Sequence, residues 1–322
     1  MQATAIAHPN VALIKYWGKA SVGTNQPAVG SLSLTLADLE TRTTVSFSNA
    51  AGGDTVMLNG APDAAAAGRV TRCLDILRAK AGTRLAAQVE SSNNFPTAAG
   101  LASSASGYAA LVRAADAALG LGLDTNELAN IARLGSGSAA RSLYSGIVTL
   151  HPDHDQQIVR CATLSDIEEW PLVTVVAITS QERKAVSSTD GMESSRLTSP
   201  LYQGWLDTHP DDLDSATDFV KARDFAGLAT VSELSCLKMH AVALSTEPPL
   251  VYWSGVTCDV MNKVRELRAA GLPVFFTVDA GPQVKAVCLP EAVDEVRRAL
   301  AAVDGVIECL VAPLGSGART IS

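Results

Sequence analysis

The clearest indication of the fold class is the stretch from Pro273 to Val311, which reads PVFFTVDAGPQVKAVCLPEAVDEVRRALAAVDGVIECLV. Residues 273–278 and 284–289 predict two strands, and the turn residues Asp-Ala-Gly-Pro lie between them. Residues 291–303 predict a helix and residues 306–311 a third strand. We therefore expect strand, strand, helix and strand in that order.

Segments upstream complete this pattern. The apolar run Leu172–Ile178 is long enough for one buried strand, and residues 256–270 predict a helix before Pro273. With further helical segments over about 213–244, the second half reads β-α-β-β-α-β, a ferredoxin-like arrangement of the α+β class. The acidic stretch Asp166–Glu169 precedes Trp170-Pro171, so we predict a domain boundary there and two domains, 1–168 and 169–322.

The first half alternates short strands with helices. Residues 31–36, Ser-Leu-Ser-Leu-Thr-Leu, alternate strictly between polar and apolar side chains, as expected of a half-buried strand. The remaining pattern predicts strands over 41–47 and 85–90, helices over 68–79, 101–119 and 126–134, and a loop over 135–138.

Composition narrows the class of protein. The chain has 322 residues, of which 47% are hydrophobic and 18% charged, as expected of about two folded domains. The net charge of -8 argues against a nucleic-acid partner. The six cysteines include no CxxC pair, so we expect neither a disulfide framework nor a zinc site. A signal-peptide pattern and an apolar run of membrane-spanning length are both missing, so we expect a cytoplasmic protein without a membrane partner.

The loop Pro96-Thr-Ala-Ala-Gly-Leu-Ala-Ser-Ser-Ala105 has the composition of a phosphate site. Small residues let the backbone approach a ligand closely, and the loop leads into a predicted helix whose N-terminus favours anions. Ser103 and Ser104 could add hydroxyl groups for a phosphate or Mg²⁺. On spacing alone, a capped helix start is the simpler interpretation.

Two other glycine-containing segments do not support a nucleotide site. Gly18-Lys19 lacks the upstream glycine of a Walker motif and is followed by Ala20 instead of Ser or Thr. The stretch 135–140, Gly-Ser-Gly-Ser-Ala-Ala, mimics a dinucleotide fingerprint, but a predicted helix precedes it where a strand is required.

Five motifs occur in order along the chain: residues 12–19 (ALIKYWGK), 93–105 (NNFPTAAGLASSA), 135–142 (GSGSAARS), 186–192 (VSSTDGM) and 278–282 (VDAGP). Together they resemble the mevalonate diphosphate decarboxylases of the GHMP kinase superfamily. The resemblance runs from about residue 5 to residue 282 and is weaker beyond.

The resemblance implies a two-domain GHMP kinase fold. Its N-terminal domain would be like domain 2 of ribosomal protein S5, and its C-terminal domain would be ferredoxin-like. It also implies ATP-dependent decarboxylation of mevalonate 5-diphosphate to isopentenyl diphosphate, by way of 3-phosphorylation, with release of ADP, phosphate and CO₂. ATP and Mg²⁺ would be required, and a homodimer would be expected.

The resemblance further implies roles for individual residues. The implied catalytic residues are Asp279, Lys15, Arg141 and Ser104, and Ser104 is also the implied metal ligand. The implied substrate contacts are Tyr16, Trp17, Gly18, Lys19, Arg69, Ser136, Gly137, Ser138, Ala139, Ala140, Arg141 and Thr189. The implied ATP-phosphate contacts are Pro96, Ala98, Ala99, Gly100, Leu101, Ala102, Ser103 and Ser104.

These roles agree with the chemistry of the side chains. Lys19 and Arg69 can form charge-assisted hydrogen bonds with a diphosphate, and Arg141 can bind a carboxylate bidentately. Asp279 would face the tertiary hydroxyl, and Lys15 beside it would lower its pKa, which favours positioning over strong base catalysis. Without the resemblance, Asp279 could be a simple turn residue and Arg141 a surface charge at a helix end.

Other activities within the superfamily stay open at this point. An enzyme acting on mevalonate 5-phosphate and a mevalonate 3-kinase without decarboxylation are the nearest, and a non-catalytic relative is a third. The presence of Asp279, Lys15 and Arg141 favours decarboxylation. One departure from the family pattern is Val29-Gly30, where asparagine and serine are usual; we expect it to affect adenine or ribose contacts.

Overall fold

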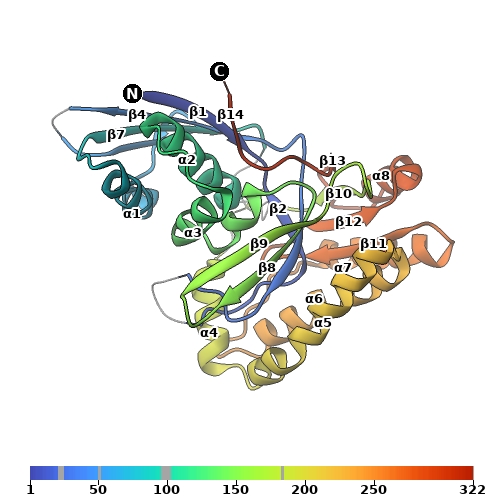
Figure 1. Ribbon diagram of the computed structural model, residues 1–322. Helices are drawn as coiled ribbons and strands as arrows, with labels where there is room; N and C mark the ends of the chain where they lie inside the picture. Colours follow the sequence, from blue (N-terminus) through green and yellow to red (C-terminus); the bar gives the residue numbers. More distant parts are fainter. Residues whose placement is uncertain (21–24, 50–51, 96–102, 183–184, 322) are drawn as a thin grey trace.

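The computed structural model describes residues 1–20, 25–49, 52–95, 103–182 and 185–321. The predicted phosphate contacts Pro96, Ala98, Ala99, Gly100, Leu101 and Ala102 lie outside the described residues. Within the described ranges, the strands form three sheets and the termini lie close together (Figure 1).

The first sheet has the order β14-β1-β4-β7-β5-β6. Its strands are β1 (Gln2–Ala7), β4 (Thr41–Ser48), β5 (Thr55–Leu58), β6 (Ala61–Pro62), β7 (Ala86–Asn93) and β14 (Arg319–Ile321). Helices α1 (Ala64–Ala81), α2 (Ser103–Leu119) and α3 (Thr125–Gly135) pack together with this sheet around a core of mostly small apolar side chains. The last strand, β14, pairs with the first strand, β1, so the end of the chain returns to the N-terminal sheet.

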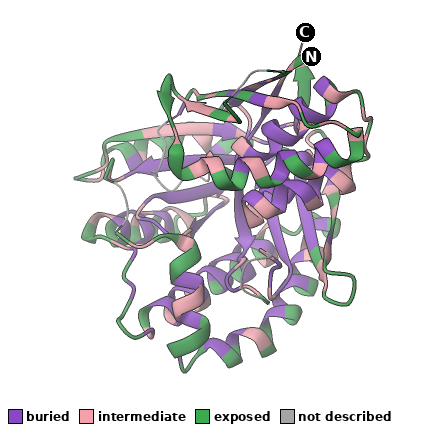
Figure 2. Ribbon diagram, turned by 90° about the vertical axis from the view of Figure 1, so that its left-hand side faces the viewer, coloured by how far each residue is buried: buried purple, intermediate pink, exposed green. Residues whose placement is uncertain are grey.

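The second sheet joins the two halves of the molecule. Its order is β2 (Asn10–Ile14), β3 (Ser31–Thr35), β8 (Ile147–Asp153) and β9 (Ile158–Ser165). Leu13 and Leu34 of this sheet share a core with Leu213 and Phe275 from the second half. Figure 2 shows the buried residues gathered in the interior of the molecule, with exposed residues on the outer faces of the helices.

The third sheet confirms the ferredoxin-like prediction. Its order is β11 (Val274–Val278), β12 (Val284–Cys288), β10 (Val173–Ile178) and β13 (Glu308–Pro313), and every neighbouring pair is antiparallel. Helices α7 (Gly255–Ala269) and α8 (Val293–Ala301) pack on it, and the short 3-10 helix η2 (Pro290–Ala292) precedes α8. The mixed two-domain GHMP kinase fold is therefore confirmed, whereas the boundary near residue 169 stays a prediction.

Three local predictions need correction. Residues 31–35 are buried on both faces, because β3 lies between β2 and β8 and its serines face the protein interior. The predicted loop 135–138 is instead the end of α3 and the start of the 3-10 helix η1 (Gly137–Leu143). Helix α5 (Tyr202–Ala222) begins before the predicted residue 213, and α6 (Phe225–Leu244) follows it after Arg223, whose φ of 54° is left-handed.

Helix α4 (Ser188–Thr198) includes most of the 186–192 motif. Ser187 caps this helix by accepting from the backbone N–H of Asp190. Within the part of the chain that the structure describes, no helix is both long enough and apolar enough to cross a membrane.

Candidate active site

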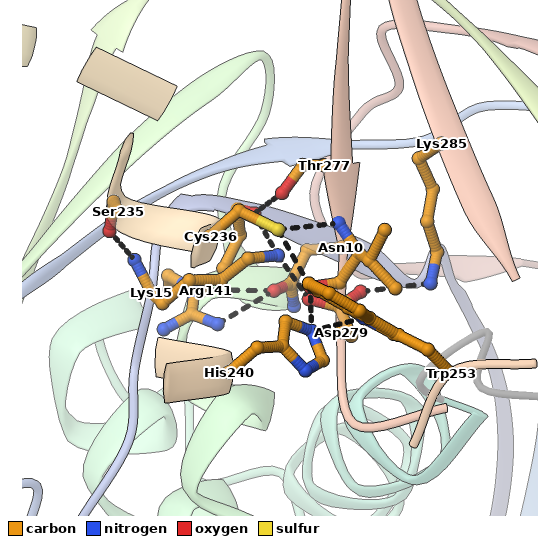
Figure 3. A network of polar contacts seen from close by, with 12 residues as sticks. Asn10, Lys15, Arg141, Ser235, Cys236, His240, Trp253, Thr277, Asp279 and Lys285 are labelled. Atoms are coloured by element: carbon orange, nitrogen blue, oxygen red, sulfur yellow. Dashed lines mark hydrogen bonds and ion pairs between the residues drawn. The ribbon is translucent and has the colours of Figure 1, made fainter. Parts of the chain in front are cut away.

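Asp279 lies at the end of β11, where a buried strand gives way to a turn. Its Oδ1 accepts from Nζ of Lys15 at 2.6 Å, and its Oδ2 pairs with Nζ of Lys285 at 3.1 Å (Figure 3). The two lysine side chains are 1% and 2% exposed, whereas the Asp279 side chain is 28% exposed. A carboxylate held by two buried ammonium groups thus presents its remaining surface to the outside.

Lys15 is placed by contacts with three separate elements. Its Nζ donates to the carbonyl of Ala12 in β2 at 2.8 Å, and its backbone N–H donates to Oγ of Ser235 in α6 at 3.0 Å. Nε2 of His209 in α5 lies 3.0 Å from the carbonyl oxygen of Lys15. Two helices of the second half therefore hold a residue that directly follows a strand of the first half.

The charges at this point determine the protonation state of Asp279. Burial alone would raise the pKa of Asp279, but the charges of Lys15 and Lys285 outweigh it and hold this pKa far below its usual range. Burial lowers the pKa of Lys285, and the charge of Asp279 counteracts that effect. The carboxylate is therefore ionised at neutral pH and is a weak base.

Arg141 lies in η1 and is 2% exposed, so it is not a surface charge at a helix end. Its Nη1 donates to Oγ of Ser31 at 2.6 Å, and its Nε and Nη2 donate to Oδ1 of Asn10 at 3.2 and 3.0 Å. No carboxylate among the described residues forms a salt bridge with it. Three of the five N–H groups of an arginine are used, which leaves two for a ligand.

This cluster has an excess of positive charge. Lys15, Lys285 and Arg141 contribute three cations and Asp279 one anion, and the charge of Asp279 acts on both Arg141 and the lysines. Because unbalanced buried charge is costly, such a cluster favours an anionic ligand.

A cavity of about 450 Å³ lies between α1, α2 and strands β4, β5 and β7. Apolar side chains such as Val56, Leu58 and Val89 form part of its wall, and Ser103 and Ser104 at the start of α2 form another part. Apolar walls with a hydroxyl-bearing helix N-terminus are suitable for a nucleoside with attached phosphates.

Hydroxyl groups connect this cavity with η1. The Oγ atoms of Ser104 and Ser136 are 3.2 Å apart, and those of Ser136 and Ser138 are 3.3 Å apart. The carbonyl of Ser138 accepts from Nδ2 of Asn10 at 3.0 Å, and the same Asn10 contacts Arg141. A row of three hydroxyls thus leads from the cavity to the cationic cluster.

Three more of the predicted substrate contacts, Lys19, Thr189 and Arg69, lie near one another. Nζ of Lys19 lies 3.5 Å from Oγ1 of Thr189, in the first turn of α4, and the charge of Arg69 acts on Lys19. Burial, together with Arg69, lowers the pKa of Lys19. Lys19 also donates to Oδ1 of Asn25 at 2.6 Å. Two cations close to a helix N-terminus form a site for a polyanion.

The hydroxyl of Tyr16 is buried and has no hydrogen-bond partner among the described residues. A Cβ on Gly137 would lie 2.6 Å from this hydroxyl, so glycine is required there for the tyrosine to fit. Burial raises the pKa of Tyr16 to about 12, so the phenol stays neutral and available as a donor. Gly18, two residues further along the chain, has a φ of 109°, a conformation that favours glycine.

Several predicted site residues have side chains that are buried in the cores around the site. The side chain of Trp17 is 1% exposed and belongs to a core with Trp205 and Tyr252, and Ala139 and Ala140 lie in the core around α2. Their side chains pack in these cores, and their roles as substrate contacts stay predictions.

The structure places Val29 and Gly30 in a packed region next to α5. Val29 packs in the same core as Trp17, and a Cβ on Gly30 would meet Leu213 at 2.5 Å. Neither residue lines the cavity. This departure from the family pattern alters packing against α5, and its effect on adenine or ribose contacts stays a prediction.

Sequence reasoning missed Asn10, Ser31 and Lys285. The available signal for Lys285 was a single charged residue within the apolar strand 284–288, since lysine is rarely buried without a partner. Asn10 and Ser31 are ordinary strand residues by composition, and only their contacts with Arg141 distinguish them.

The described residues contain no group of three or more His, Cys, Asp or Glu side chains arranged to hold a metal ion. Mg²⁺ commonly keeps several water ligands and binds through substrate phosphates with few protein groups. The exposed hydroxyl of Ser104, on the cavity wall, fits that mode of binding.

Comparison with known proteins agrees with this geometry. A family model described as the diphosphomevalonate decarboxylase-like N-terminal domain matches residues 7–161. A second, described as the mevalonate 5-diphosphate decarboxylase C-terminal domain, matches residues 174–309. The diphosphomevalonate decarboxylase of Schizosaccharomyces pombe is 36% identical, over 99% of this chain and 87% of its own length. That of Saccharomyces cerevisiae is 35% identical, over 87% of this chain and 76% of its own length.

Solved structures show the same relationship. Mevalonate diphosphate decarboxylase from Staphylococcus aureus has a TM-score of 0.94 at 36% identity and covers 100% of this chain, with 98% of its own length aligned. A structure of MDDEF in complex with MVAPP, AMPPCP and magnesium has a TM-score of 0.92 at 38% identity, with 100% and 99% coverage. Both halves of this chain therefore place it in the diphosphomevalonate decarboxylase family.

Proposed function

We propose that this protein catalyses the ATP-dependent decarboxylation of mevalonate 5-diphosphate to isopentenyl diphosphate, with release of ADP, phosphate and CO₂. The observation that carries the proposal is the ionised Asp279, held by Lys15 and set beside the buried Arg141. This arrangement offers an acceptor for a hydroxyl and cations for a carboxylate within one cluster.

The substrate can be placed by matching its groups to those of the site. Lys19, Arg69 and Thr189 would bind the diphosphate, with the unpartnered hydroxyl of Tyr16 as a further donor. The two available N–H groups of Arg141 would bind the carboxylate. The tertiary hydroxyl would then lie against the exposed side of Asp279.

ATP would occupy the cavity between α1, α2, β4, β5 and β7, with its phosphates toward Ser103 and Ser104. Mg²⁺, held by phosphate oxygens and the hydroxyl of Ser104, would neutralise phosphate charge as it shifts to the leaving group. The structurally similar complex with MVAPP, AMPPCP and magnesium supports these ligands. The serine row from Ser104 to Ser138 would keep the two substrates close together.

In the first step, the tertiary hydroxyl oxygen attacks the γ-phosphorus of ATP, and the bond from that phosphorus to the bridging oxygen of ADP breaks. Asp279 accepts a hydrogen bond from the hydroxyl and orients it. Because the pKa of Asp279 is held far below its usual range, we assign it positioning and charge stabilisation. The proton of the hydroxyl passes to an oxygen of the transferred phosphate or to solvent.

In the second step, the C–O bond to the new phosphate breaks and phosphate leaves with the electron pair. The positive charge that develops on the tertiary carbon draws the electrons of the bond to the carboxyl group. That bond breaks, its pair forms the double bond of isopentenyl diphosphate, and CO₂ is released. Arg141 keeps the carboxylate in place until this bond breaks.

An assay of CO₂ and ADP release tests the proposal. The purified protein with ATP and Mg²⁺ should release one CO₂ per ADP from mevalonate 5-diphosphate, and far less from mevalonate 5-phosphate. ADP formation without CO₂ would identify a kinase instead. A preference for the monophosphate would show that Lys19 and Arg69 do not select a diphosphate.

Two finer points belong to the proposal, and the second of them rests on the family resemblance alone. We propose that the protein acts in the cytoplasm and that it forms a homodimer. Analytical ultracentrifugation at several protein concentrations tests the second point, and a monomer throughout would contradict it.

A further inference from the structure

Lys285 is a charged residue inside a buried strand. It lies in β12, whose other residues Val284, Ala286, Val287 and Cys288 are all buried and apolar. Lys285 itself is 1% exposed, and its Nζ pairs with Oδ2 of Asp279 at 3.1 Å. The strand thus brings a second cation to the carboxylate, at Oδ2, whereas Lys15 lies at Oδ1.

Stability alone does not account for this lysine. Asp279 already has a buried cation, since Lys15 holds its Oδ1 at 2.6 Å. A second buried ammonium gives the cluster more positive charge than one carboxylate balances, and such groups cost several kcal/mol to desolvate. An apolar residue at position 285 would pack as the rest of β12 does.

We propose that Lys285 is a positioning residue of the phosphorylation step. It fixes Oδ2 while Lys15 fixes Oδ1, so the Asp279 carboxylate is held in one orientation toward the substrate hydroxyl. Each oxygen keeps a lone-pair direction that neither lysine uses. The inference rests on the proposed function, because it assigns Lys285 to the orientation of a group in that reaction.

The effect of replacing Lys285 depends on the other groups that face Asp279. Lys15 faces it from the position just after β2, Arg141 acts on it from η1, and Cys236 and His240 face it from α6. Burial keeps Cys236 and His240 uncharged, because it raises the thiol pKa and lowers the imidazole pKa. Of the neighbours with charge, only Lys15 and Lys285 contact the carboxylate directly within the described residues.

The test compares Lys285→Met and Lys285→Arg with the wild type, by CO₂ release as a function of pH and by thermal melting. In Lys285→Met we expect kcat to fall by about 10- to 100-fold, as for other lost positioning contacts, with KM for ATP unchanged. The acid limb of the kcat profile should move to higher pH, because Asp279 loses one of the cations that keep it ionised. Lys285→Arg should restore most of the rate and the position of the acid limb.

Lys238→Met is the matched control, since Lys238 forms a 2.8 Å ion pair with Asp212 between α5 and α6. It should lower the melting temperature without moving the acid limb. Should Lys285→Met not fold, Lys285→Gln takes its place with the same readouts. A Lys285 variant that melts lower but keeps the wild-type rate and acid limb would overturn the inference. A wild type that releases no CO₂ would instead contradict the proposed function.

Discussion

Replacing Asn10 by aspartate would test whether Arg141 binds a substrate anion. Asn10 is 4% exposed and its side chain is fully engaged. Its Oδ1 accepts from Nε and Nη2 of Arg141 at 3.2 and 3.0 Å, and its Nδ2 donates to the carbonyl of Ser138 and to Oγ of Ser142 at 3.0 and 2.8 Å. A neutral acceptor therefore holds Arg141 without cancelling its charge.

Aspartate at position 10 keeps the shape and changes the charge. Two donated hydrogen bonds are lost, at about 0.5–1.5 kcal/mol each, and a charged pair with Arg141 is gained at about 1.5–3 kcal/mol. The free energy of unfolding should therefore change by less than about 2 kcal/mol. The new carboxylate competes with the substrate for Arg141, so substrate affinity should fall by about 1.5–3 kcal/mol, or about 10- to 150-fold.

Calorimetric titration of Asn10→Asp with mevalonate 5-diphosphate and, separately, with ATP would measure this effect. Only the first affinity should fall. Asn130→Asp is the matched control, because Asn130 bonds to Val159 between α3 and β9 and contacts none of the candidate site residues. It should lose stability and keep substrate affinity. A Kd for mevalonate 5-diphosphate unchanged by Asn10→Asp would refute the assignment of Arg141 to a substrate anion.

Three further predictions concern single residues. Asp279→Asn should lower turnover on the order of 10³-fold with ATP affinity unchanged, since the charge that faces the reacting hydroxyl is lost. If rapid-quench measurements show that the variant keeps about a tenth of the wild-type rate, Asp279 has no part in the mechanism. Ser104→Ala should lower kcat more than substrate affinity, whereas a pure helix-cap role would lower the melting temperature and leave turnover intact. Burial lowers the pKa of His240 to about 3, so its contribution to stability is complete above about pH 6.5 and is lost as the pH falls. The unfolding free energy should drop by about 2 kcal/mol from pH 7 to pH 5, and denaturant titration of His240→Gln should show that much less pH dependence.

Local sequence patterns were sufficient for most of the secondary structure. The strands predicted at 273–278 and 284–289 are β11 and β12, and the helix predicted at 256–270 is α7. Hydrophobic periodicity indicates such elements because side chains three or four residues apart in a helix, or two apart in a strand, lie on one face and are buried together. Periodicity misjudged residues 31–35, where the apparent solvent face is buried beneath η1.

The five sequence motifs alone indicated the family and pointed to Asp279, Lys15 and Arg141 as candidate catalytic residues. The roles of these residues stay predictions. By themselves, the residues were compatible with a turn aspartate and a surface arginine. Only the tertiary structure showed Arg141 to be 2% exposed and held by Asn10 and Ser31.

Lys285 and the charge balance of the site depend entirely on the tertiary structure. Lys15 and Asp279 are 264 residues apart in sequence, and they meet because α6 and β11 of the second half pack against β2 of the first. A hydrophobic pattern in the sequence indicates which side chains of a single helix or strand are buried. It does not record which charges two distant elements bring within hydrogen-bonding distance, because electrostatic energy depends on separation in space.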